Sequence, residues 1–454
     1  MIRIAMPKQV EDILKKLHKA GFEAYAVGGC VRDCIMGVEP EDWDITTSAF
    51  PEEVKALFKR TIDTGLKHGT VSVMIDKIAY EITTFRVDGL YEDFRRPKGV
   101  SFTGDLVEDL KRRDFTMNAM AYNEIEGLVD VFGGRKDIED KIIRCVGVAE
   151  ERFQEDALRM LRAIRFSAKL GFKMSEDTKR AIRLKAPLIK NISGERINME
   201  MTKILTSDNP HYVEYLVKLG LMEHIIPEFM KNVGIDQKNK HHIYSIDRHI
   251  YKSLKYIEPV VKLRWAMFLH DIGKGYCFTI DQNGVGHFYG HEKISVELSA
   301  KILNRLKFDN NTKADIIKLI HYHDYRIIPE IKQVRRAVHI IGQELFEDFL
   351  KVQRADVLSQ NPSFYDENLG KLEKIHECFL EILEKKQCTT IKQLEINGFD
   401  LIELGIAQGR KIGEILGALL ALVIEEPEKN TRKLLLEKAK ELAAYTEPGN
   451  SDKI

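Results

Sequence analysis

The sequence predicts an α+β protein, with a mixed α/β head followed by an all-helical neck, body and tail. Residues 71–75 and 79–85 alternate apolar and polar side chains on either side of Asp76-Lys77, which is typical of two strands joined by a tight turn. Beyond Lys141 the strand signals fade and apolar residues recur at helical spacing. A chain of 454 residues is long enough for several such domains.

The head is expected to begin with a helix, a short strand and a glycine pair. Apolar residues recur at helical spacing over residues 10–17, and Gly21 follows as a stop signal. Residues 24–27 predict a strand that leads directly into Gly28-Gly29.

The same patterns divide the chain into four parts. We expect a head over residues 1–140, a neck over 141–205, a body over 206–360 and a tail over 361–454. Helical periodicity is clearest at residues 157–170, 199–205, 261–269, 345–352 and 431–442. Residues 231–239 are polar and contain a glycine, which makes them the best candidate for a linker.

Composition narrows the class of protein. The 70 basic and 70 acidic side chains cancel, so net charge neither requires nor excludes a nucleic-acid partner. Six cysteines without a CxxC pair indicate reduced thiols in a cytosolic protein. The first residues lack a signal-peptide core, and the longest apolar run, residues 415–424, is too short for a bilayer. We therefore expect a cytoplasmic protein without a membrane partner.

The most informative segment joins the glycine pair to two alternate carboxylates. Gly28-Gly29 after a strand lets backbone N–H groups approach a phosphate, and Arg32 adds positive charge, although a plain turn would use the same glycines. If residues 42–46 are extended, Asp42 and Asp44 point to the same face. Such a pair can hold Mg²⁺ against a nucleoside triphosphate. A solvated strand edge is the plain alternative.

Further polar residues extend this candidate site. Glu81, on the second predicted strand, could receive the proton of an attacking 3′-hydroxyl or could simply be exposed. Arg112 and Arg113 offer bidentate donors for a triphosphate, and Asp114 and Asn118 can hydrogen-bond to ribose hydroxyls. A charged helix end with Arg112–Asp109 pairing would explain the same residues.

Four motifs together resemble a known family. GGCVRD (28–33), DWD (42–44), RRDFTMNA (112–119) and EDALRMLRAIRF (155–166) resemble the class II, bacterial-type tRNA nucleotidyltransferases (CCA-adding enzymes) and their poly(A) polymerase relatives. The resemblance implies a polymerase-β-like head and a two-metal mechanism with Mg²⁺ held by Asp42 and Asp44. It implies CTP and ATP as substrates and tRNA as partner, contacted at its acceptor stem and elbow.

The neck carries residues that could select the nucleotide. Asp156 and Arg159 are three apart near the start of a predicted helix and should share a face. Aspartate accepts and arginine donates, which matches the amine and ring nitrogen of C and A but not G or U. The resemblance gives this pair the role of a template, with Glu155 orienting Arg159, and the basic run continues at Arg162 and Arg165. An ordinary surface ion-pair set is the alternative.

Residues 86–97 predict a mobile, charged loop between the strands and the RRDFT motif. In the resembling enzymes, a loop here helps the pocket change from C to A, and enzymes that add only the two C residues lack it. Its presence indicates that this protein can add A. An ordinary surface loop would have the same composition.

The body resembles an HD domain over about residues 240–360. The ligand set for a divalent metal would be His249, His270, Asp271 and Asp356, and His291 and His321 could widen it to a second metal. Imidazole and carboxylate ligands suit Mn, Ni, Fe or Zn, or Mg if oxygen ligands dominate. In related enzymes, such a domain can be a phosphatase or phosphodiesterase, or it can be vestigial.

The tail also resembles the family, and its basic residues could contact tRNA phosphates or form a solvated face: Arg410, Lys411, Lys429, Arg432 and Lys433. The sequence therefore predicts an enzyme that adds C, C and A to tRNA 3′ ends. A tRNA nucleotidyltransferase that adds only the terminal A, a poly(A) polymerase and, from another class, an HD-domain phosphohydrolase are the alternatives.

Overall fold

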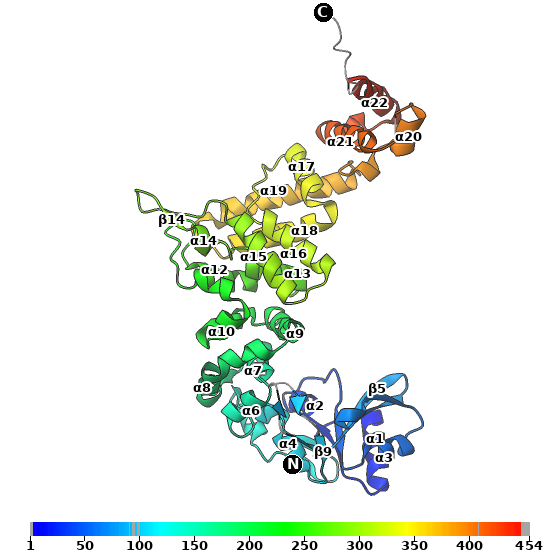
Figure 1. The fold of residues 1–454 in the computed structure, drawn as a ribbon, viewed down its shortest axis with the longest axis vertical. Helices are drawn as coiled ribbons and strands as arrows, with labels where there is room; N and C mark the ends of the chain where they lie inside the picture. The colour runs from blue at the N-terminus through cyan, green and yellow to red at the C-terminus, as the bar shows by residue number, and fades with distance from the viewer. Residues whose placement is uncertain (1–2, 90, 93–95, 98–99, 407, 446–454) are drawn as a thin grey trace, which may run out of the picture. The chain divides into compact units, whose positions relative to one another are not determined.

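The computed structural model describes residues 3–89, 91–92, 96–97, 100–406 and 408–445 (Figure 1). The chain divides into two compact units. The first comprises the chain up to Lys231 together with Ile302–Phe308, and the second comprises Asn232–Lys301 and Asp309 onward. The predicted α+β class is confirmed, because the sheet lies in the first unit and the second is almost wholly helical. The four predicted part boundaries stay predictions.

A mixed seven-stranded sheet forms the head, in the order β11-β10-β1-β2-β5-β4-β3. Its strands are β1 (Ala24–Val27), β2 (Ile45–Thr47), β3 (Thr61–Gly65), β4 (Thr70–Ile75), β5 (Ile78–Thr84), β10 (Ala121–Asn123) and β11 (Gly127–Val129). Strand β2 is antiparallel to β1 and parallel to β5. The β4–β5 hairpin turns at Asp76 and Lys77, as predicted, and both residues have a positive φ.

Helices cover both faces of this sheet. Helix α1 (Lys8–Lys19) and helix α3 (Pro51–Leu57) pack on one face, where their apolar side chains contact the core that contains Ile45 and Ile82. Helix α4 (Leu106–Lys111) packs on the other face against Tyr25 and Val27. All four residues of β1 are buried, because its alternating side chains enter one core or the other. Strand β1 is therefore a rigid support for the glycine pair that follows it.

The rest of the first unit is mainly helical. Its helices are α2 (Gly29–Ile35), α5 (Gly134–Glu139), α6 (Ala149–Glu155), α7 (Leu158–Leu170), α8 (Glu176–Lys185), α9 (Gly194–Leu205), α10 (Glu214–Lys218) and α11 (Met222–Ile225). Short strand pairs join β6 (Arg86–Asp88) to β9 (Val100–Phe102), β7 (Tyr91–Glu92) to β8 (Arg96–Pro97) and β12 (Ile142–Ile143) to β13 (Lys173–Met174). Residues 90 and 93–95 of the predicted loop lie outside the described residues.

Two predicted acidic motifs lie outside the regular elements. Strand β2 begins at Ile45, so Asp42 and Asp44 precede it. Its partner strand β1 ends at Val27, whose N–H donates to the Asp44 carbonyl, and residues before Asp44 therefore have no strand to pair with. Asp156 does not lie within a helix. It separates α6 from α7 in an extended conformation, and its Oδ1 accepts the Leu158 N–H at 3.0 Å.

The second unit is a helical assembly with one short hairpin (Figure 1). Its elements are α12 (Ile246–Ser253), α13 (Val261–Leu269), α14 (Lys274–Cys277), β14 (Thr279–Ile280), β15 (Gly286–His287), α15 (His291–Arg305), α16 (Asn310–Tyr322), α17 (Ile331–Ile341), α18 (Gln343–Val357), α19 (Tyr365–Glu384), α20 (Gly398–Glu403), α21 (Arg410–Glu425) and α22 (Arg432–Tyr445). The end of α15, from Ile302, belongs to the first unit. The last three helices share their own apolar core. Within the described part of the chain, every helix is too short or too polar to cross a bilayer.

Candidate functional site

A cavity of about 1310 Å³ in the first unit gathers most of the residues predicted for the head and neck. It exceeds the roughly 300–1,000 Å³ of ordinary small-ligand pockets, so it has room for more than a single small molecule. Its lining includes Gly28, Gly29, Arg32, Asp42, Asp44, Arg112, Arg113, Asp114, Asn118, Asp156, Arg159, Arg162 and Arg165. Glu81 and Glu155 are not part of the lining.

Gly28 is the residue that brings the backbone close to this cavity. Its φ of 86° lies in the region that favours glycine, and its N–H donates to the Met120 carbonyl at 3.1 Å. A Cβ at this position would lie 3.0 Å from Nη1 of Arg113. A side chain here would therefore strain the turn and displace a guanidinium group of the cavity.

Asp42 and Asp44 line the cavity from the segment just before β2, and both are exposed. The Asp44 carbonyl accepts the Val27 N–H at 3.0 Å, which fixes its backbone to the end of β1. Partial desolvation inside the cavity raises the pKa of Asp44, and the charges of Asp42 and Glu81 raise it further, while Arg113 opposes them. Three carboxylates thus crowd negative charge at one place, and their oxygens are ligands that suit a hard divalent cation.

Asp109 holds the two arginines of the RRDFT motif, and its pairing with Arg112 is the plain alternative that the sequence offered for this motif. Arg112 donates from Nε and Nη2 to its Oδ1 at 2.9 and 2.8 Å, and Arg113 Nη2 lies 3.4 Å from Oδ2. Burial alone would raise the pKa of Asp109, but the two guanidinium groups hold it below its usual range. The ion pairs of a plain charged helix end are therefore present. They also fix both arginines beside the cavity.

A second network ties the Asp114–Asn118 motif to the neck. Arg162 donates to Asp114 Oδ2 at 2.7 Å, and Arg32 donates to Asn118 Oδ1 at 2.7 Å. Burial would raise the pKa of Asp114, yet Arg162 and Arg159 keep it lowered. Ribose contacts by Asp114 or Asn118 would thus be made by groups that protein contacts already orient.

Asp156 and Arg159 line the same cavity although only Arg159 is helical. Arg159 is 9% exposed, and it donates to Glu155 Oε2 at 2.6 Å and to the Arg112 carbonyl at 2.9 Å. Asp156 Oδ2 accepts from Arg196 at 2.9 Å. The Glu155–Arg159 pair is therefore largely buried and fixes the guanidinium, unlike a typical surface pair.

Helix α9 supports this arrangement through residues that no sequence signal identified. Its Arg196 contacts Asp156, and its Glu200 lies 2.9 Å from Arg165. Arg165 also lies over the Phe166 ring, 4.1 Å from its centroid. Arg196 and Glu200 are 40 and 35 residues beyond their partners, so only the packing of α9 against the segment of Asp156 and α7 brings them together.

The second unit contains a separate cluster of buried histidines and aspartates. His249 and His270 are fully buried, their Nε2 atoms lie 3.4 and 3.2 Å from Asp271 Oδ2, and Asp356 Oδ1 lies 2.9 Å from His249 Nε2. All four predicted ligands are thus together. Although burial lowers it, Asp271 and Asp356 raise the pKa of His270 to about 10. Such concentrated negative charge fits a cation at this place.

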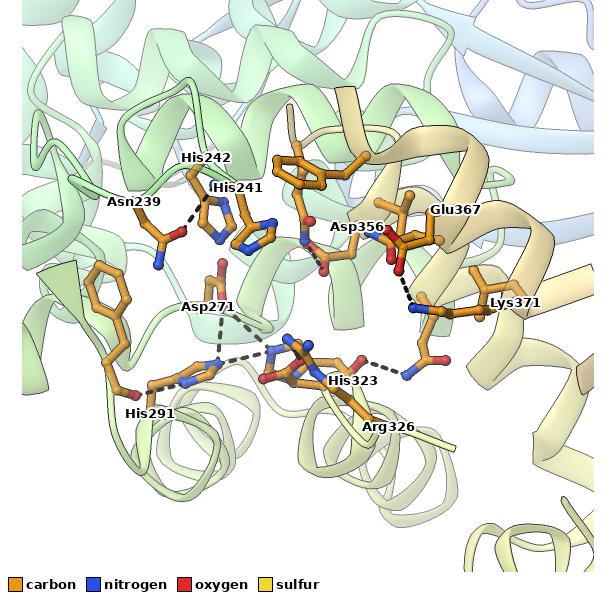
Figure 2. Close-up of a pocket in the computed structure, with 18 of the residues that line it drawn as sticks. Asn239, His241, His242, Asp271, His291, His323, Arg326, Asp356, Glu367 and Lys371 are labelled. Carbon is orange, nitrogen blue, oxygen red and sulfur yellow. Dashed lines mark hydrogen bonds and ion pairs between the residues drawn. The ribbon is translucent and has the colours of Figure 1, made fainter. Parts of the chain in front are cut away.

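The second histidine pair differs from the prediction. His291 lies in the cluster as expected, but His321 is exposed, and His323 occupies the place assigned to it. His323 follows the last residue of α16, so its side chain points to the opposite side from that of His321. His291 and His323 are each 3.5 Å from Asp271 Oδ1 (Figure 2). A cavity of about 780 Å³ opens onto this pair.

The basic residues predicted for the tail lie in the second unit and mostly pair with acids. Arg410 contacts Glu414 at 2.8 Å, and Arg432 contacts Asp400 at 2.6 Å. Lys429 contacts Glu426, Lys411 donates to the Ala443 carbonyl, and Lys433 is exposed. These contacts fit the solvated-face alternative at least as well as phosphate binding.

Three family models match the chain: the poly A polymerase head domain over residues 24–144, a "probable RNA and SrmB-binding site of polymerase A" over 171–232, and domain 2 of tRNA nucleotidyltransferases over 290–439. The CCA-adding enzyme of Geobacillus kaustophilus is 57% identical over 198 residues, which are 44% of this chain and 49% of that protein. The match thus spans about half the length of this relative. The CCA-adding enzyme of Ligilactobacillus salivarius is 36% identical over 437 residues, or 96% of each chain.

A solved structure agrees with these relatives. The crystal structure of Bacillus stearothermophilus CCA-adding enzyme in complex with CTP aligns with 97% of this chain and 99% of its own, at 32% identity and a TM-score of 0.73. Similarity therefore extends from the head to the tail and includes the motifs that line the cavity. This chain belongs to the family of CCA-adding enzymes.

Proposed function

We propose that the protein adds C, C and A to the 3′ end of tRNA, using CTP and ATP and no nucleic-acid template. One observation carries the proposal: in a chain of this family, the Asp42–Asp44 pair and the Asp156–Arg159 pair line one cavity. The partner would be tRNA, bound at its acceptor stem and elbow. The reaction would take place in the cytoplasm, in keeping with six free cysteines.

Asp42 and Asp44 would hold two Mg²⁺ ions, since they offer oxygen ligands and lie with Glu81 in a region of unbalanced negative charge. When bound, these ions supply a lowered pKa for the primer hydroxyl and charge neutralisation for the triphosphate. Glu81 would receive the proton of the 3′-hydroxyl. The hydroxyl oxygen would bond to the α-phosphorus of the nucleotide, and pyrophosphate would leave beside Arg112 and Arg113.

Base selection would depend on complementary hydrogen bonds. Asp156 would accept from the exocyclic amine of C or A, and Arg159 would donate to the ring nitrogen. A carboxylate oxygen can accept more than one hydrogen bond, so the contacts of Asp156 with Leu158 and Arg196 leave it able to receive the amine. G and U would face Asp156 with a carbonyl and Arg159 with an N–H, and unpaired buried polar groups are costly.

Addition of A is supported by the presence of residues 86–97, which were expected to form a loop and which contain the short strands β6, β7 and β8. The direct test uses tRNAs that end before CCA, after C and after CC, with CTP and ATP supplied separately and together. We expect CTP to extend the first two and ATP to extend only the third. Failure to extend the shortest tRNA with CTP would contradict the proposal in favour of A-only addition, and long A tails would favour a poly(A) polymerase.

A second candidate function is hydrolysis of a phosphate ester in the second unit. The observation that favours it is a buried His–Asp cluster that faces a cavity also lined by Lys240, Arg326 and Lys371. His249, His270, Asp271 and Asp356 would hold a divalent metal there. Release of nitrophenol from p-nitrophenyl phosphate and its diester, with Mn²⁺ or Ni²⁺, tests this function. We expect His270→Ala to abolish it, and equal turnover by that variant would refute it.

A further inference from the structure

Glu155 lies between two arginines in the first unit. Arg159 donates from Nη1 to its Oε2 at 2.6 Å, and Nη2 of Arg152 lies 2.6 Å from its Oε1. The two arginines come from different helices, because Arg152 lies in the last turn of α6 and Arg159 in the first turn of α7. The three side chains are only 10–22% exposed, so water and salt screen their contacts less than those of a surface pair.

The same two arginines bind the end of helix α4 in the head. Arg152 Nη1 donates to the Lys111 carbonyl at 3.2 Å, and Arg159 Nη2 donates to the Arg112 carbonyl at 2.9 Å. Lys111 is the last residue of α4 and Arg112 is its C-cap, and the last carbonyls of a helix lack partners within the helix. Both guanidinium groups are therefore anchored on adjacent carbonyls at one place.

The backbone of Arg152 contacts the two residues that are proposed to select the base. Its carbonyl accepts the Asp156 N–H at 3.3 Å and Nη1 of Arg159 at 3.4 Å. These contacts do not depend on the side chain at position 152, so a substitution there tests the guanidinium itself. Among the described residues, the cavity lining includes Arg159 but neither Arg152 nor Glu155. The Arg152 side chain would therefore act on a bound nucleotide through Glu155 and Arg159.

The contact between Arg152 and Glu155 limits how Glu155 can bind Arg159. A carboxylate and a guanidinium commonly form a bidentate pair with two parallel N–H···O bonds. Such a pair would turn the Arg159 guanidinium so that two of its donors face Glu155 instead of the cavity. Arg152 competes for Oε1 and so disfavours this arrangement, and the Glu155–Arg159 hydrogen bond is made by Oε2.

We propose that Arg152 is a positioning residue for nucleotide selection. Its guanidinium holds Oε1 of Glu155, disfavours the bidentate pair and thereby keeps Arg159 directed toward the base in the cavity. This inference rests on the proposed selection of C and A by Asp156 and Arg159. The new element is Arg152, which would contact no substrate atom and would act through Glu155.

Competition between CTP and UTP on one tRNA that ends before CCA tests the role of Arg152. Arg152→Met keeps an apolar stem and removes the guanidinium, and it should lower discrimination against UTP by about 3–10-fold, less than loss of Arg159 itself. The KM for CTP should rise by a similar factor with kcat nearly unchanged, because base contacts stabilise the bound substrate and the transition state alike. Arg152→Lys should recover part of the discrimination, since an ammonium can contact Oε1 as a point charge.

A double-mutant cycle separates this role from a general effect on folding. In a Glu155→Gln background, Arg152→Met should cause no further loss of discrimination, because the two substitutions remove the same contact. A residue that merely supported the fold would add its effect to that of Glu155→Gln. Arg180→Met is the matched control. Arg180 also contacts an acidic residue of α6, Glu150, but it is 69% exposed, and its loss should leave the ratio unchanged.

An unchanged ratio of CTP to UTP addition in folded Arg152→Met would overturn the inference, and so would additive losses in the cycle. If Arg152→Met has lost its circular dichroism spectrum, Arg152→Gln, which keeps a polar side chain, takes its place under the same expectations. Arg159→Ala in the same assay keeps the two proposals apart. A lowered ratio in Arg159→Ala beside an unchanged ratio in Arg152→Met would reject only the role of Arg152. Unchanged ratios in both would reject base selection by Arg159.

Discussion

Asp42 and Asp44 in the first unit are exposed to solvent, whereas Asp271 in the second unit is 1% exposed and lies among four imidazoles. Arg112 and Arg162, which line the first cavity, are held by other acids, Asp109 and Asp114. In the second unit, the carboxylate and imidazoles contact one another directly. The carboxylates of the first cavity are therefore open to solvent, whereas that of the second is buried among imidazoles.

The difference indicates how each site would use a metal. Exposed carboxylates without built-in imidazoles suit an ion that is exchanged with each nucleotide, since Mg²⁺ keeps several waters and binds through few protein oxygens. Buried imidazoles fixed by backbone carbonyls suit an ion that stays in the folded protein. The bound nucleotide would contribute to the choice of metal in the first site, whereas the protein's own imidazole and carboxylate ligands would decide it in the second.

The largest expected effect comes from the head carboxylates. Asp42→Ala with Asp44→Ala should lower CCA addition by about a thousandfold or more, because the metals supply much of the charge stabilisation of the transition state. The measurement is single-turnover addition of radiolabelled CMP to tRNA. The corresponding Asn variants keep the side-chain volume and should fail equally. Substantial activity in either would mean that other residues hold the metals.

Chelation should distinguish the two units by stability. An ion at about 100 times its Kd stabilises the folded state by about 2.7 kcal/mol. Its removal should lower the Tm of the second unit by about 5–10 °C. Differential scanning calorimetry measures this, and Mn²⁺ but not Mg²⁺ should restore the transition. A Tm that chelation leaves unchanged would mean that the buried cluster holds no resident ion.

Loss of Arg159, the arginine proposed to contact the base, should alter the choice of nucleotide more than the affinity for nucleotides. Arg159→Ala should reduce discrimination of CTP against UTP by about 10–100-fold, the range expected when buried polar groups lose their partners. Competition between the two nucleotides on one tRNA gives the ratio of kcat/KM values. Arg183→Ala, an exposed arginine on α8, is the control and should leave the ratio unchanged. An equally unchanged ratio in Arg159→Ala would refute the template argument.

The smallest effect should come from Arg196, which acts through Asp156. Arg196→Ala should reduce discrimination against UTP only a few-fold, because a half-exposed ion pair contributes at most about 1 kcal/mol. Arg196→Lys should recover part of the loss, which a purely structural role would not require. Glu195→Ala, an exposed neighbour on α9, serves as control. If Arg196→Ala equals Arg159→Ala, Arg196 itself contacts the base.

Sequence reasoning was most accurate where a local pattern decides the structure. The β4–β5 hairpin follows from alternation around Asp76-Lys77, and the helix over Val261–Leu269 follows from its apolar content. Motif resemblance brought together the residues that line the first cavity. Neither pattern located the end of the β1–β2 ladder, because that depends on where the partner strand turns at Gly28.

Local periodicity and motifs of fixed spacing are enough to predict the fold class, the family and most of the polar residues of both sites. The contacts of Arg196 with Asp156 and of Glu200 with Arg165 depend instead on how α9 packs in the folded chain. The choice between His321 and His323 also depends on the fold. Both lie at the end of one helix, but only His323 faces Asp271, whereas His321 faces solvent. Such choices depend on packing between segments far apart in the chain, and no single stretch of sequence encodes them.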